Sequence, residues 1–349
     1  MTKLTDIALQ FTDTVTALAP LGNGLINDTF LVTSARSALV LQRINRVVFP
    51  QPTLIMDNLR VLNQHLQQKS ADILKLEIPT ALSTRLGQAY FEDADGEIWR
   101  ALSFIADTDS LETLQHTQEA EQAGWALAHF HGLVSDLPPA LLHDTLPGFH
   151  IAPDYLRNYQ QVAHTTAIPA DPLNAYCTAA IAHCQHWADD LETAKHTGEL
   201  TLRVIHGDPK LNNFLFAKTS GRIISLIDLD TVKPGLVHYD IGDCLRSCCH
   251  NSDDDSFNLS LCRAVLKSYL AEAKHFFTAA DYQYLYPAIR LIPFELGLRF
   301  YTDYLQGNRY FKVTEPLQNL HRAAAQLRLC ASINAQETAI KALIAELGA

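Results

Sequence analysis

The 349-residue chain lacks the features that define several broad classes of protein. No uninterrupted apolar stretch approaches the roughly 18 residues that a membrane span needs. Lysine and arginine are not clustered, and a formal net charge of -11 weighs against a surface for nucleic-acid phosphates. The sequence therefore predicts neither a membrane nor a nucleic-acid partner. An anionic ligand would have to be held locally, by a few cations, backbone amides or a metal ion.

Paired cysteines and a signal peptide are also missing. The seven cysteines form an odd set without a CxxC pair, which argues against a disulfide framework or a zinc site and predicts buried free thiols. Asp6, Gln10 and Asp13 interrupt the start of the chain, which is therefore a poor signal peptide. We expect a reducing, cytoplasmic location, and no sequence feature indicates an obligate protein partner.

The first hundred residues are rich in β-branched, aromatic and alternating residues, which are typical of strands. A helix is predicted at 52–68, where leucine and isoleucine recur at helical spacing. The predicted strands, which would form one five-stranded sheet, are 15–18, 29–33, 38–44, 88–91 and 98–105.

Beyond 106–110 the pattern becomes mostly helical, interrupted by a β insert at 202–230. The predicted helical ranges are 117–135, 153–165, 172–195, 256–275, 279–306 and 315–347. We therefore predict an α+β fold with a small β-rich lobe at 1–105 and a larger α-rich lobe at 106–349. Clefts between lobes are favoured places for small-molecule sites.

The stretch HGDPKLNN (206–213) places a carboxylate, two amides and a lysine directly after an apolar run. Alone it would be an ordinary turn. Asp228, however, follows the apolar segment IISL, and a carboxylate there is costly unless a charge or hydrogen bond meets it. Asp208, Asn213 and Asp228 thus form either a capping network or a cation site, which Asp230 would extend. Oxygen ligands favour Mg²⁺ or Ca²⁺.

The spacing of these residues favours the cation site. His-x-Asp, four residues, Asn, and then a strand that ends in Asp is the arrangement found in kinases. There the first aspartate accepts a hydroxyl proton, while the asparagine and the second aspartate hold Mg²⁺ on the nucleotide phosphates. The chemistry requires these groups because the transition state spreads negative charge over the phosphoryl oxygens and attack requires a positioned hydroxyl.

These motifs resemble those of the aminoglycoside phosphotransferase and choline kinase superfamily. The resemblance rests on VIHGDPKLNNFLF and LIDLDTVKPGLVHYDIGDCLRS, spans about 15–330, and implies a protein-kinase-like bilobal fold that uses ATP and Mg²⁺. It implies a nucleotide-binding lobe at 1–105 and a catalytic and substrate-binding lobe at 106–349. A narrower resemblance is to N-acetylhexosamine 1-kinases, which phosphorylate the anomeric hydroxyl of the sugar; it rests on 23–32, 40–50, 226–235 and 299–311.

The resemblance implies roles for the residues of the motif. Asp208 would be the catalytic base, and Asn213 and Asp228 would be the Mg²⁺ ligands. Asn212 does not have the offset of the ligand amide. Asp230 is either a second metal ligand or a brace for its loop.

The β-rich lobe matches the family less closely. Gly22 and Gly24 would cover the phosphates with backbone amides, although a third glycine is missing. The third-strand lysine of kinases is replaced by Gln42, with Arg43 beside it, and successive strand residues point to opposite faces. The cation for the α- and β-phosphates is therefore unassigned. Arg43 could also pair with Asp57, although a solvated helix face is the simpler explanation for that aspartate.

Adenine and sugar sites follow from the same resemblance. Adenine would bind backbone groups from Phe104 to Ala106. Arg299 and Tyr310 would bind the sugar, through a planar fork and through a stacking face with a hydroxyl. The alternatives are an ion pair of Arg299 with Asp303 and a half-buried core tyrosine. Leu25 stands where the subgroup often has histidine, so the sugar preference could differ.

Other polar residues are interpreted as structural. Asp240 and Asp243 would cap a helix and pair with Arg246. The histidine-rich segments at 128–131 and 182–186 have no third ligand at a familiar metal-binding spacing.

The sequence thus favours an ATP- and Mg²⁺-dependent kinase acting on an N-acetylhexosamine or related sugar. Kinases for choline, homoserine or an aminoglycoside remain alternatives. A nucleotide-binding pseudokinase is a third possibility, suggested by the missing lysine. The intact Asp208, Asn213 and Asp228 weigh against it, because a scaffold has no use for a catalytic base.

Overall fold

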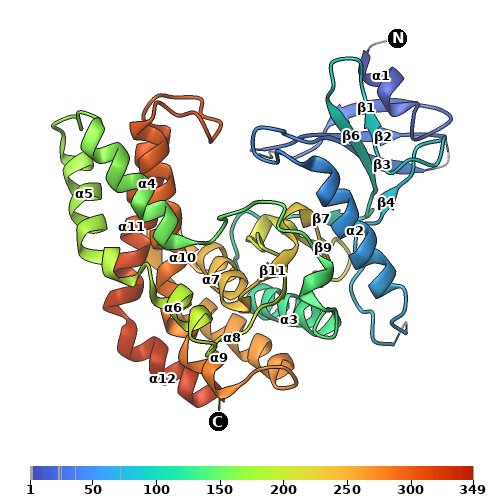
Figure 1. The fold of residues 1–349 in the computed structure, drawn as a ribbon. Helices are drawn as coiled ribbons and strands as arrows, with labels where there is room; N and C mark the ends of the chain where they lie inside the picture. The colour runs from blue at the N-terminus through green and yellow to red at the C-terminus, as the bar shows by residue number, and fades with distance from the viewer. Residues whose placement is uncertain (1–2, 23, 25, 36, 71, 349) are drawn as a thin grey trace.

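The computed structural model describes residues 3–348, apart from 23, 25, 36 and 71. It consists of a small part built on an antiparallel sheet and a larger, mostly helical part (Figure 1). The N-terminus lies at the small part, and the C-terminus lies at the far end of the helical part. The predicted α+β class with two unequal lobes is confirmed.

The small part holds a six-stranded antiparallel sheet and two helices. The helices are α1 (Lys3–Ala8) and α2 (Pro52–Leu66). The strand order is β1-β2-β3-β6-β4, and β5 pairs with β6. The strands are β1 (Ala17–Pro20), β2 (Asp28–Thr33), β3 (Ala38–Arg43), β4 (Ala81–Leu82), β5 (Phe91–Glu92) and β6 (Ile98–Ser103).

Successive side chains of β3 and β6 point to opposite sides of the sheet, so its two faces carry different residues. Leu41 packs on one face with Trp99 and with Ile7 of α1, in a small hydrophobic cluster. The neighbouring positions Gln42 and Arg100 are cross-strand partners, and by the period of two they point to the other face. One face is therefore a closed core, and the other carries polar groups toward the helical part.

Four of the five predicted strands overlap the observed ones by two residues or more, whereas 88–91 shares only Phe91 with β5, and the sheet has six strands instead of the predicted five. β1 begins at Ala17 instead of 15, and β5 begins at Phe91 instead of 88. The strand β4 and the helix α1 are not among the predicted elements. Both are short, so neither contains enough residues to show a period.

The larger part is a helical assembly with α10 at its centre. α10 contacts α11, α7, α4 and α12, and α3 packs along α8. The helices are α3 (Thr117–Leu133), α4 (Ala152–Thr165), α5 (Pro172–Cys184), α6 (Asp190–His196), α7 (Val237–Cys248), α8 (Leu259–Ala273), α9 (Ala279–Gln283), α10 (Leu285–Leu305), α11 (Gln318–Ala335) and α12 (Glu337–Gly348), with 3-10 turns at Pro139–Leu141, Gln185–Trp187, Leu211–Asn213 and Leu229–Thr231.

Four helical predictions need correction. The predicted helices 279–306 and 315–347 each form two helices, α9 with α10 and α11 with α12. The predicted helix 172–195 is divided, because the 3-10 turn Gln185–Trp187 separates α5 from α6. Helix α7 is absent from the predicted ranges. Its apolar residues Val237, Ile241, Leu245 and Cys248 do recur at helical spacing, and its polar residues His238, Asp240 and Asp243 are buried as well, so both faces of the helix are packed.

Short strands in the larger part position the motif residues. The strands β10 (Ile223–Leu226), β9 (Phe214–Ala217) and β7 (Thr108–Asp109) form a three-stranded sheet. β11 (Lys233–Gly235) pairs with β8 (Arg203–Ile205), and β12 (His250–Asn251) pairs with β13 (Ser256–Phe257). Because β7 pairs with β9, the segment that leaves the small part becomes an edge strand of the larger one.

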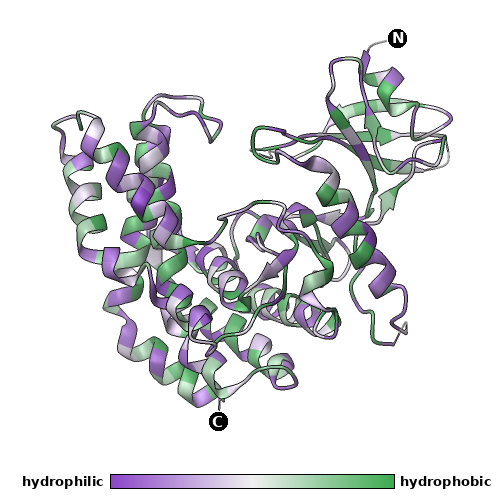
Figure 2. Cartoon of the chain, in the orientation of Figure 1, coloured by the Kyte–Doolittle hydropathy of each residue, from purple (hydrophilic) through white to green (hydrophobic). Residues whose placement is uncertain are grey.

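Hydropathy is mixed along the helices, where hydrophobic and hydrophilic residues alternate in both parts (Figure 2). Within the described ranges, no helix is long and apolar enough to cross a membrane. The seven cysteines are free and buried, as the sequence predicts.

Candidate active site

The loop that carries Asp208 connects β8 to the turn Leu211–Asn213 and is hydrogen-bonded to Asp240 of α7. The carboxylate of Asp240 accepts hydrogen bonds from the backbone N–H groups of His206 and Gly207, at 2.7 and 2.8 Å, and from His131 Nε2 at 2.8 Å. Burial alone would raise the pKa of Asp240, but these donors lower it below its usual value. A buried, ionised aspartate thus fixes the backbone just before Asp208.

Gly207 allows this loop to lie against the loop that carries Asp228. Its φ is 88°, a left-handed conformation that favours glycine. A Cβ at this position would lie 2.5 Å from the carbonyl oxygen of Thr231. Thr231 Oγ1 in turn donates to the carbonyl oxygen of His206 at 2.9 Å. The two loops are therefore in direct contact and require glycine at the point of contact.

His206 makes a second connection between the two loops. Its Nε2 lies 3.0 Å from the carbonyl oxygen of Ile227, and its Nδ1 accepts the backbone N–H of Asp208 at 3.3 Å. Burial lowers the pKa of His206, which favours the neutral ring. With Nε2 protonated and Nδ1 free to accept, one neutral tautomer satisfies both contacts.

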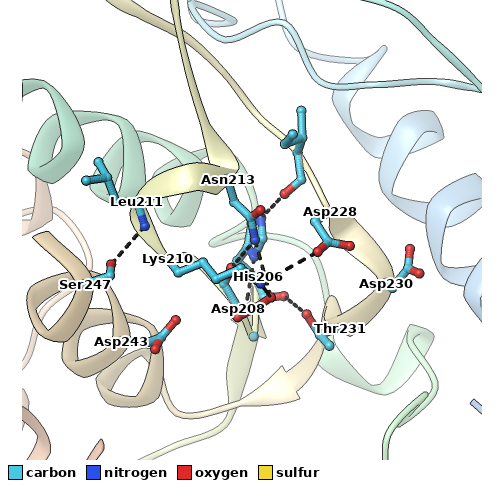
Figure 3. A network of polar contacts seen from close by, with 12 residues as sticks. His206, Asp208, Lys210, Leu211, Asn213, Asp228, Asp230, Thr231, Asp243 and Ser247 are labelled. Atoms are coloured by element: carbon cyan, nitrogen blue, oxygen red, sulfur yellow. Dashed lines mark hydrogen bonds and ion pairs between the residues drawn. The ribbon is translucent and has the colours of Figure 1, made fainter. Parts of the chain in front are cut away.

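The structure brings together Asp208, Asn213 and Asp228, as predicted (Figure 3). Asn213 Nδ2 donates to the backbone carbonyl of Asp208 at 2.7 Å. The ammonium of Lys210 pairs with the Asp208 carboxylate and lies 4.0 Å from Asp228 Oδ2. A cation already lies between the two carboxylates, which shows that the site can hold positive charge.

Asp228 lies in an environment that disfavours its own charge. Its backbone is left-handed, with φ 65°, between β10 and the turn Leu229–Thr231. Burial and the charges of Asp230 and Asp208 raise its pKa to about 6, although Lys210 opposes this shift. A bound cation would relieve this repulsion. The Asp228 carboxylate and the amide oxygen of Asn213 fit Mg²⁺, which when bound offsets charge on nucleotide phosphate oxygens.

Asp230 is buried, with 2% of its surface exposed, and lies apart from this group (Figure 3). Its Oδ2 accepts a hydrogen bond from Asn27 Nδ2 at 2.7 Å, and its Oδ1 pairs with the guanidinium of Arg100. Both carboxylate oxygens are engaged, so of the two alternatives for Asp230 the geometry favours the brace.

The glycine-containing loop joins β1 to β2. Gly22 has φ 71°, and a Cβ at Gly24 would meet only the carbonyl of Asn27, at 3.6 Å, among the described residues. Asn27 anchors the end of this loop, because it binds Asp230 and also accepts the backbone N–H of Asn45 at 2.9 Å. Leu25 lies outside the described residues.

Gln42 and Arg43 have different surroundings. Gln42 Oε1 accepts hydrogen bonds from Arg100 at 3.0 and 2.7 Å, on the face directed to the helical part. Arg43 is on the opposite face and binds Asp28, with Nε 3.0 Å from Oδ2. The possible pair of Arg43 with Asp57 is wrong, and Asp57 is an exposed residue of α2.

The predicted adenine contacts lie in the segment between β6 and β7. Phe104 is half-buried, Ile105 is buried and Ala106 is exposed. The carbonyl of Ile105 accepts a hydrogen bond from Thr108 Oγ1 at 3.0 Å. The segment is therefore fixed at its centre, while its adenine contacts stay a prediction.

Arg299 is enclosed by aromatic rings. Its guanidinium carbon lies 5.0 Å from the ring centres of Phe149 and Tyr155, 5.5 Å from that of Phe311 and 5.8 Å from that of Tyr310. These distances are within the range of cation–π contacts. Burial would lower the pKa of Arg299, but its neighbours, Asp208 among them, raise it. The guanidinium of Arg299 is therefore permanently charged.

The alternative pairing of Arg299 with Asp303 is wrong. The carboxylate of Asp303 accepts the backbone N–H groups of Arg309 and Tyr310 at 2.8 Å and of Phe311 at 3.0 Å. It therefore shapes the loop after α10, which brings Tyr310 and Phe311 to Arg299. The alternative of a core tyrosine does not fit Tyr310 either, because it is 39% exposed.

Comparisons with known proteins agree with this geometry. The model of the phosphotransferase enzyme family matches residues 17–276. The chain belongs to this family. A microcompartment-associated aminopropanol kinase is 18% identical over 97% of this chain and 98% of its own, with a TM-score of 0.67.

Two further solved structures share the fold at similar identity. An aminoglycoside phosphotransferase from Alicyclobacillus acidocaldarius is 14% identical, covers 97% of this chain and 96% of its own, and has a TM-score of 0.68. A choline/ethanolamine kinase family protein from Mesorhizobium loti is 15% identical, with 100% and 99% covered and a TM-score of 0.60. The superfamily resemblance is confirmed, whereas the narrower likeness to N-acetylhexosamine 1-kinases stays a prediction.

Several residues of this phosphotransferase site were missed by sequence reasoning. Asp240 holds the catalytic loop instead of only capping a helix, although the predicted pair of Asp243 with Arg246 is present at 2.8 Å. Arg100 joins Gln42 to Asp230, which are 58 and 130 positions from it in the sequence. Its only sequence signal is an arginine inside an apolar strand, IWRALS, where a charge needs a buried partner.

Proposed function

We propose that this phosphotransferase is an ATP- and Mg²⁺-dependent kinase that phosphorylates the anomeric hydroxyl of an N-acetylhexosamine or a related sugar. The observation that carries the acceptor assignment is the guanidinium of Arg299, which lies among the rings of Phe149, Tyr155, Tyr310 and Phe311. The reaction class rests on the grouping of Asp208, Asn213 and Asp228.

Each residue has a role in this proposal. Asp208 accepts the proton of the acceptor hydroxyl and aligns it for attack. Asn213 and Asp228 hold Mg²⁺. Gly22 and Gly24 offer backbone amides to the phosphates, and the backbone of 104–106 binds adenine. Use of ATP is consistent with the predicted cytoplasmic location.

The charge of the acceptor pocket argues against a cationic acceptor. The names of similar proteins include an aminopropanol kinase and choline/ethanolamine kinases, whose named acceptors are amines. The Arg299 guanidinium alone would repel an ammonium about 5 Å away by about 3 kcal/mol at an effective dielectric constant near 20, which corresponds to roughly a hundredfold loss of affinity. The Glu295 carboxylate, 4.0 Å from Arg299 Nη1, offsets part of this repulsion. A neutral acceptor avoids the repulsion.

A sugar makes use of the groups that surround Arg299. The planar guanidinium can donate two parallel hydrogen bonds to hydroxyl or acetamido oxygens. Tyr310, exposed at 39%, offers both a ring face and a hydroxyl. The choice of the anomeric hydroxyl rests on the resemblance to N-acetylhexosamine 1-kinases.

An acceptor panel tests the proposal. N-acetylglucosamine, N-acetylgalactosamine, glucose, choline, homoserine and an aminoglycoside are each assayed for ADP release with Mg-ATP, and the product is identified by ³¹P NMR. We expect turnover with an N-acetylhexosamine and a phosphorus signal coupled to the anomeric proton. Preferred turnover with an amine would replace the sugar assignment. ATP binding without turnover of any acceptor would support the pseudokinase.

A further inference from the structure

The cation that kinases carry on their third strand has no obvious counterpart in this chain. In kinases, a lysine on that strand pairs with the α- and β-phosphates and with a helix glutamate. Here Gln42 occupies the lysine position on β3. The inference below rests on the proposed kinase function and concerns which residue replaces that lysine.

Arg100 lies beside Gln42 on the next strand. It is the cross-strand partner of Gln42, so both side chains leave the same face of the sheet. Arg100 Nε and Nη2 donate to Gln42 Oε1 at 3.0 and 2.7 Å, and the side chain is 1% exposed. Gln42 therefore acts as an acceptor that orients the guanidinium of Arg100.

The same guanidinium reaches the loop that carries Asp228. Its Nη2 pairs with Asp230 Oδ1, two positions after Asp228. Asp230 also accepts Asn27 Nδ2 at 2.7 Å through its other oxygen, and its backbone carbonyl accepts Thr145 Oγ1 at 2.7 Å. Arg100 and Asn27 of the sheet part thus both bind the Asp230 side chain of the helical part, and Thr145 binds the Asp230 backbone.

The burial of Arg100 is costly, which argues that the position serves a purpose beyond packing. Its Nη1 is buried and has no hydrogen-bond partner among the described residues. An unsatisfied buried donor costs about 1–3 kcal/mol, and hydrophobic residues often replace buried ion pairs without loss of stability. Apolar residues at positions 100 and 230 together would therefore pack without this cost, whereas methionine at position 100 alone would leave the Asp230 carboxylate buried without its cation.

Two other cations are less suitable for this role. Arg43 points to the opposite face of the sheet and binds Asp28. Lys210 belongs to the catalytic loop and pairs with the base Asp208.

We propose that Arg100 is the positioning residue that takes the place of the third-strand lysine. From β6 it binds Asp230, couples the nucleotide lobe to the metal-binding loop, and so holds Asp228 where Mg²⁺ on the nucleotide can reach it. In kinases this connection is the ion pair between the third-strand lysine and a helix glutamate. Here a series of contacts from Gln42 through Arg100 to Asp230 takes its place.

The test uses Arg100→Met, Arg100→Lys, Asp230→Asn and the Arg100→Met/Asp230→Asn double variant in the full-length protein. Calorimetry measures ATP binding with and without Mg²⁺, and hydrogen exchange without nucleotide follows residues 227–231. For Arg100→Met we expect about tenfold or weaker binding of Mg-ATP, about tenfold faster exchange in 227–231, and little change in metal-free ATP binding. Arg100→Lys should recover part of the Mg-ATP affinity.

The double variant shows whether the two residues act as one unit. If they do, its loss of Mg-ATP affinity should be close to that of Arg100→Met alone. Additive losses would contradict the proposal. A loss of metal-free ATP affinity equal to the loss of Mg-ATP affinity would also overturn it, because Arg100 would then contact the phosphates directly.

Arg290→Met is the matched control, because it removes another arginine from an ion pair within the helical part. Arg290 Nη2 lies 2.7 Å from Asp190, and its guanidinium carbon is 4.6 Å above the Trp187 ring. We expect it to lower the melting temperature without changing Mg-ATP affinity. An Arg100→Met variant that behaves in the same way would have lost only stability, and the proposal would be wrong.

These measurements need no acceptor, so they separate this inference from the proposed function. If wild-type protein binds Mg-ATP but Arg100→Met binds it equally well, the positioning role fails and the kinase proposal stands. If wild-type protein does not bind Mg-ATP, both fail.

Discussion

The two loops that would face the nucleotide are held in different ways. The proposed catalytic loop at 206–210 is fixed by buried hydrogen bonds that it donates to Asp240 and accepts from Thr231, and by contacts of the His206 ring. The glycine-containing loop at 21–27 is tied at its end, through Asn27, to Asp230 and Asn45. The groups proposed to carry the chemistry are preorganised, whereas the loop proposed to cover the phosphates is anchored mainly through Asn27, where it meets the loop of Asp228.

The comparison indicates where substitutions should affect chemistry and where they should affect ligand binding. Changes at the catalytic and metal-binding loops should lower kcat strongly, because these loops align the reacting groups. Changes at the acceptor pocket or at contacts between the two parts should act mainly on KM.

The largest effect is expected for Asp228→Asn. The amide removes one anionic oxygen from the Mg²⁺ site, so kcat should fall by about a hundredfold or more, as expected for the loss of a metal ligand. The melting temperature should not fall, because the carboxylate is repelled by Asp230 and Asp208. Steady-state kinetics over a Mg²⁺ titration and thermal unfolding test this, and wild-type activity at limiting Mg²⁺ would rule out the ligand role.

Gly207→Ala should have the next largest effect. The added Cβ would lie 2.5 Å from the Thr231 carbonyl and would separate the two loops, at a φ of 88°. We expect a loss of a few kcal/mol of stability, above the ~1–3 kcal/mol of backbone strain alone, together with a lower kcat.

The matched control is Gly198→Ala. Gly198 also has a positive φ, of 80°, but no described atom lies within 4 Å of the added Cβ. This variant should show the backbone strain alone, with kcat unchanged. Equal losses of stability and activity for the two variants would show that contact between the loops is unimportant.

Arg299→Ala should raise KM for the acceptor about tenfold or more, with a small change in KM for ATP, since a charged hydrogen-bond donor contributes about 1.5–3 kcal/mol. Arg299→Lys keeps the charge but loses the planar fork, and we expect an intermediate value. Initial rates with each substrate varied in turn measure both constants. Equal effects on both would place Arg299 outside the acceptor pocket.

The smallest effect is expected for Lys312→Ala. Lys312 Nζ lies 3.4 Å from Asp28 Oδ1 and connects the loop after α10 to β2. Both side chains are solvent-accessible, and such pairs contribute about 0–1 kcal/mol, so KM for the acceptor should change less than severalfold. A tenfold change, measured in the same assay, would show that this contact closes the cleft.

The sequence predicts the contacts between residues that are close together in the chain, but not the contacts between residues that are far apart in it. Asp208 and Asn213 are five positions apart in one motif, and Asp228 ends a recognisable apolar strand, so their meeting was predictable. Arg100 and Asp230 are 130 positions apart, and no spacing rule connects them. Helix α7 was missed although its apolar residues recur at helical spacing, and the contact of its buried Asp240 with the loop of Asp208 has no local sequence signal. The unpredicted features are thus buried polar contacts between distant segments.

The central claim, that Asp208 is the base of a small-molecule kinase, is tested most directly by single-turnover phosphoryl transfer in Asp208→Asn. The amide keeps the size of the side chain but removes the basic oxygen. We predict that the rate falls by about 10²- to 10⁴-fold while the Kd for ATP changes little. Loss of ATP binding without a separate loss of rate, or a melting temperature lower by many degrees, would contradict the account and make Asp208 a metal-binding or structural residue.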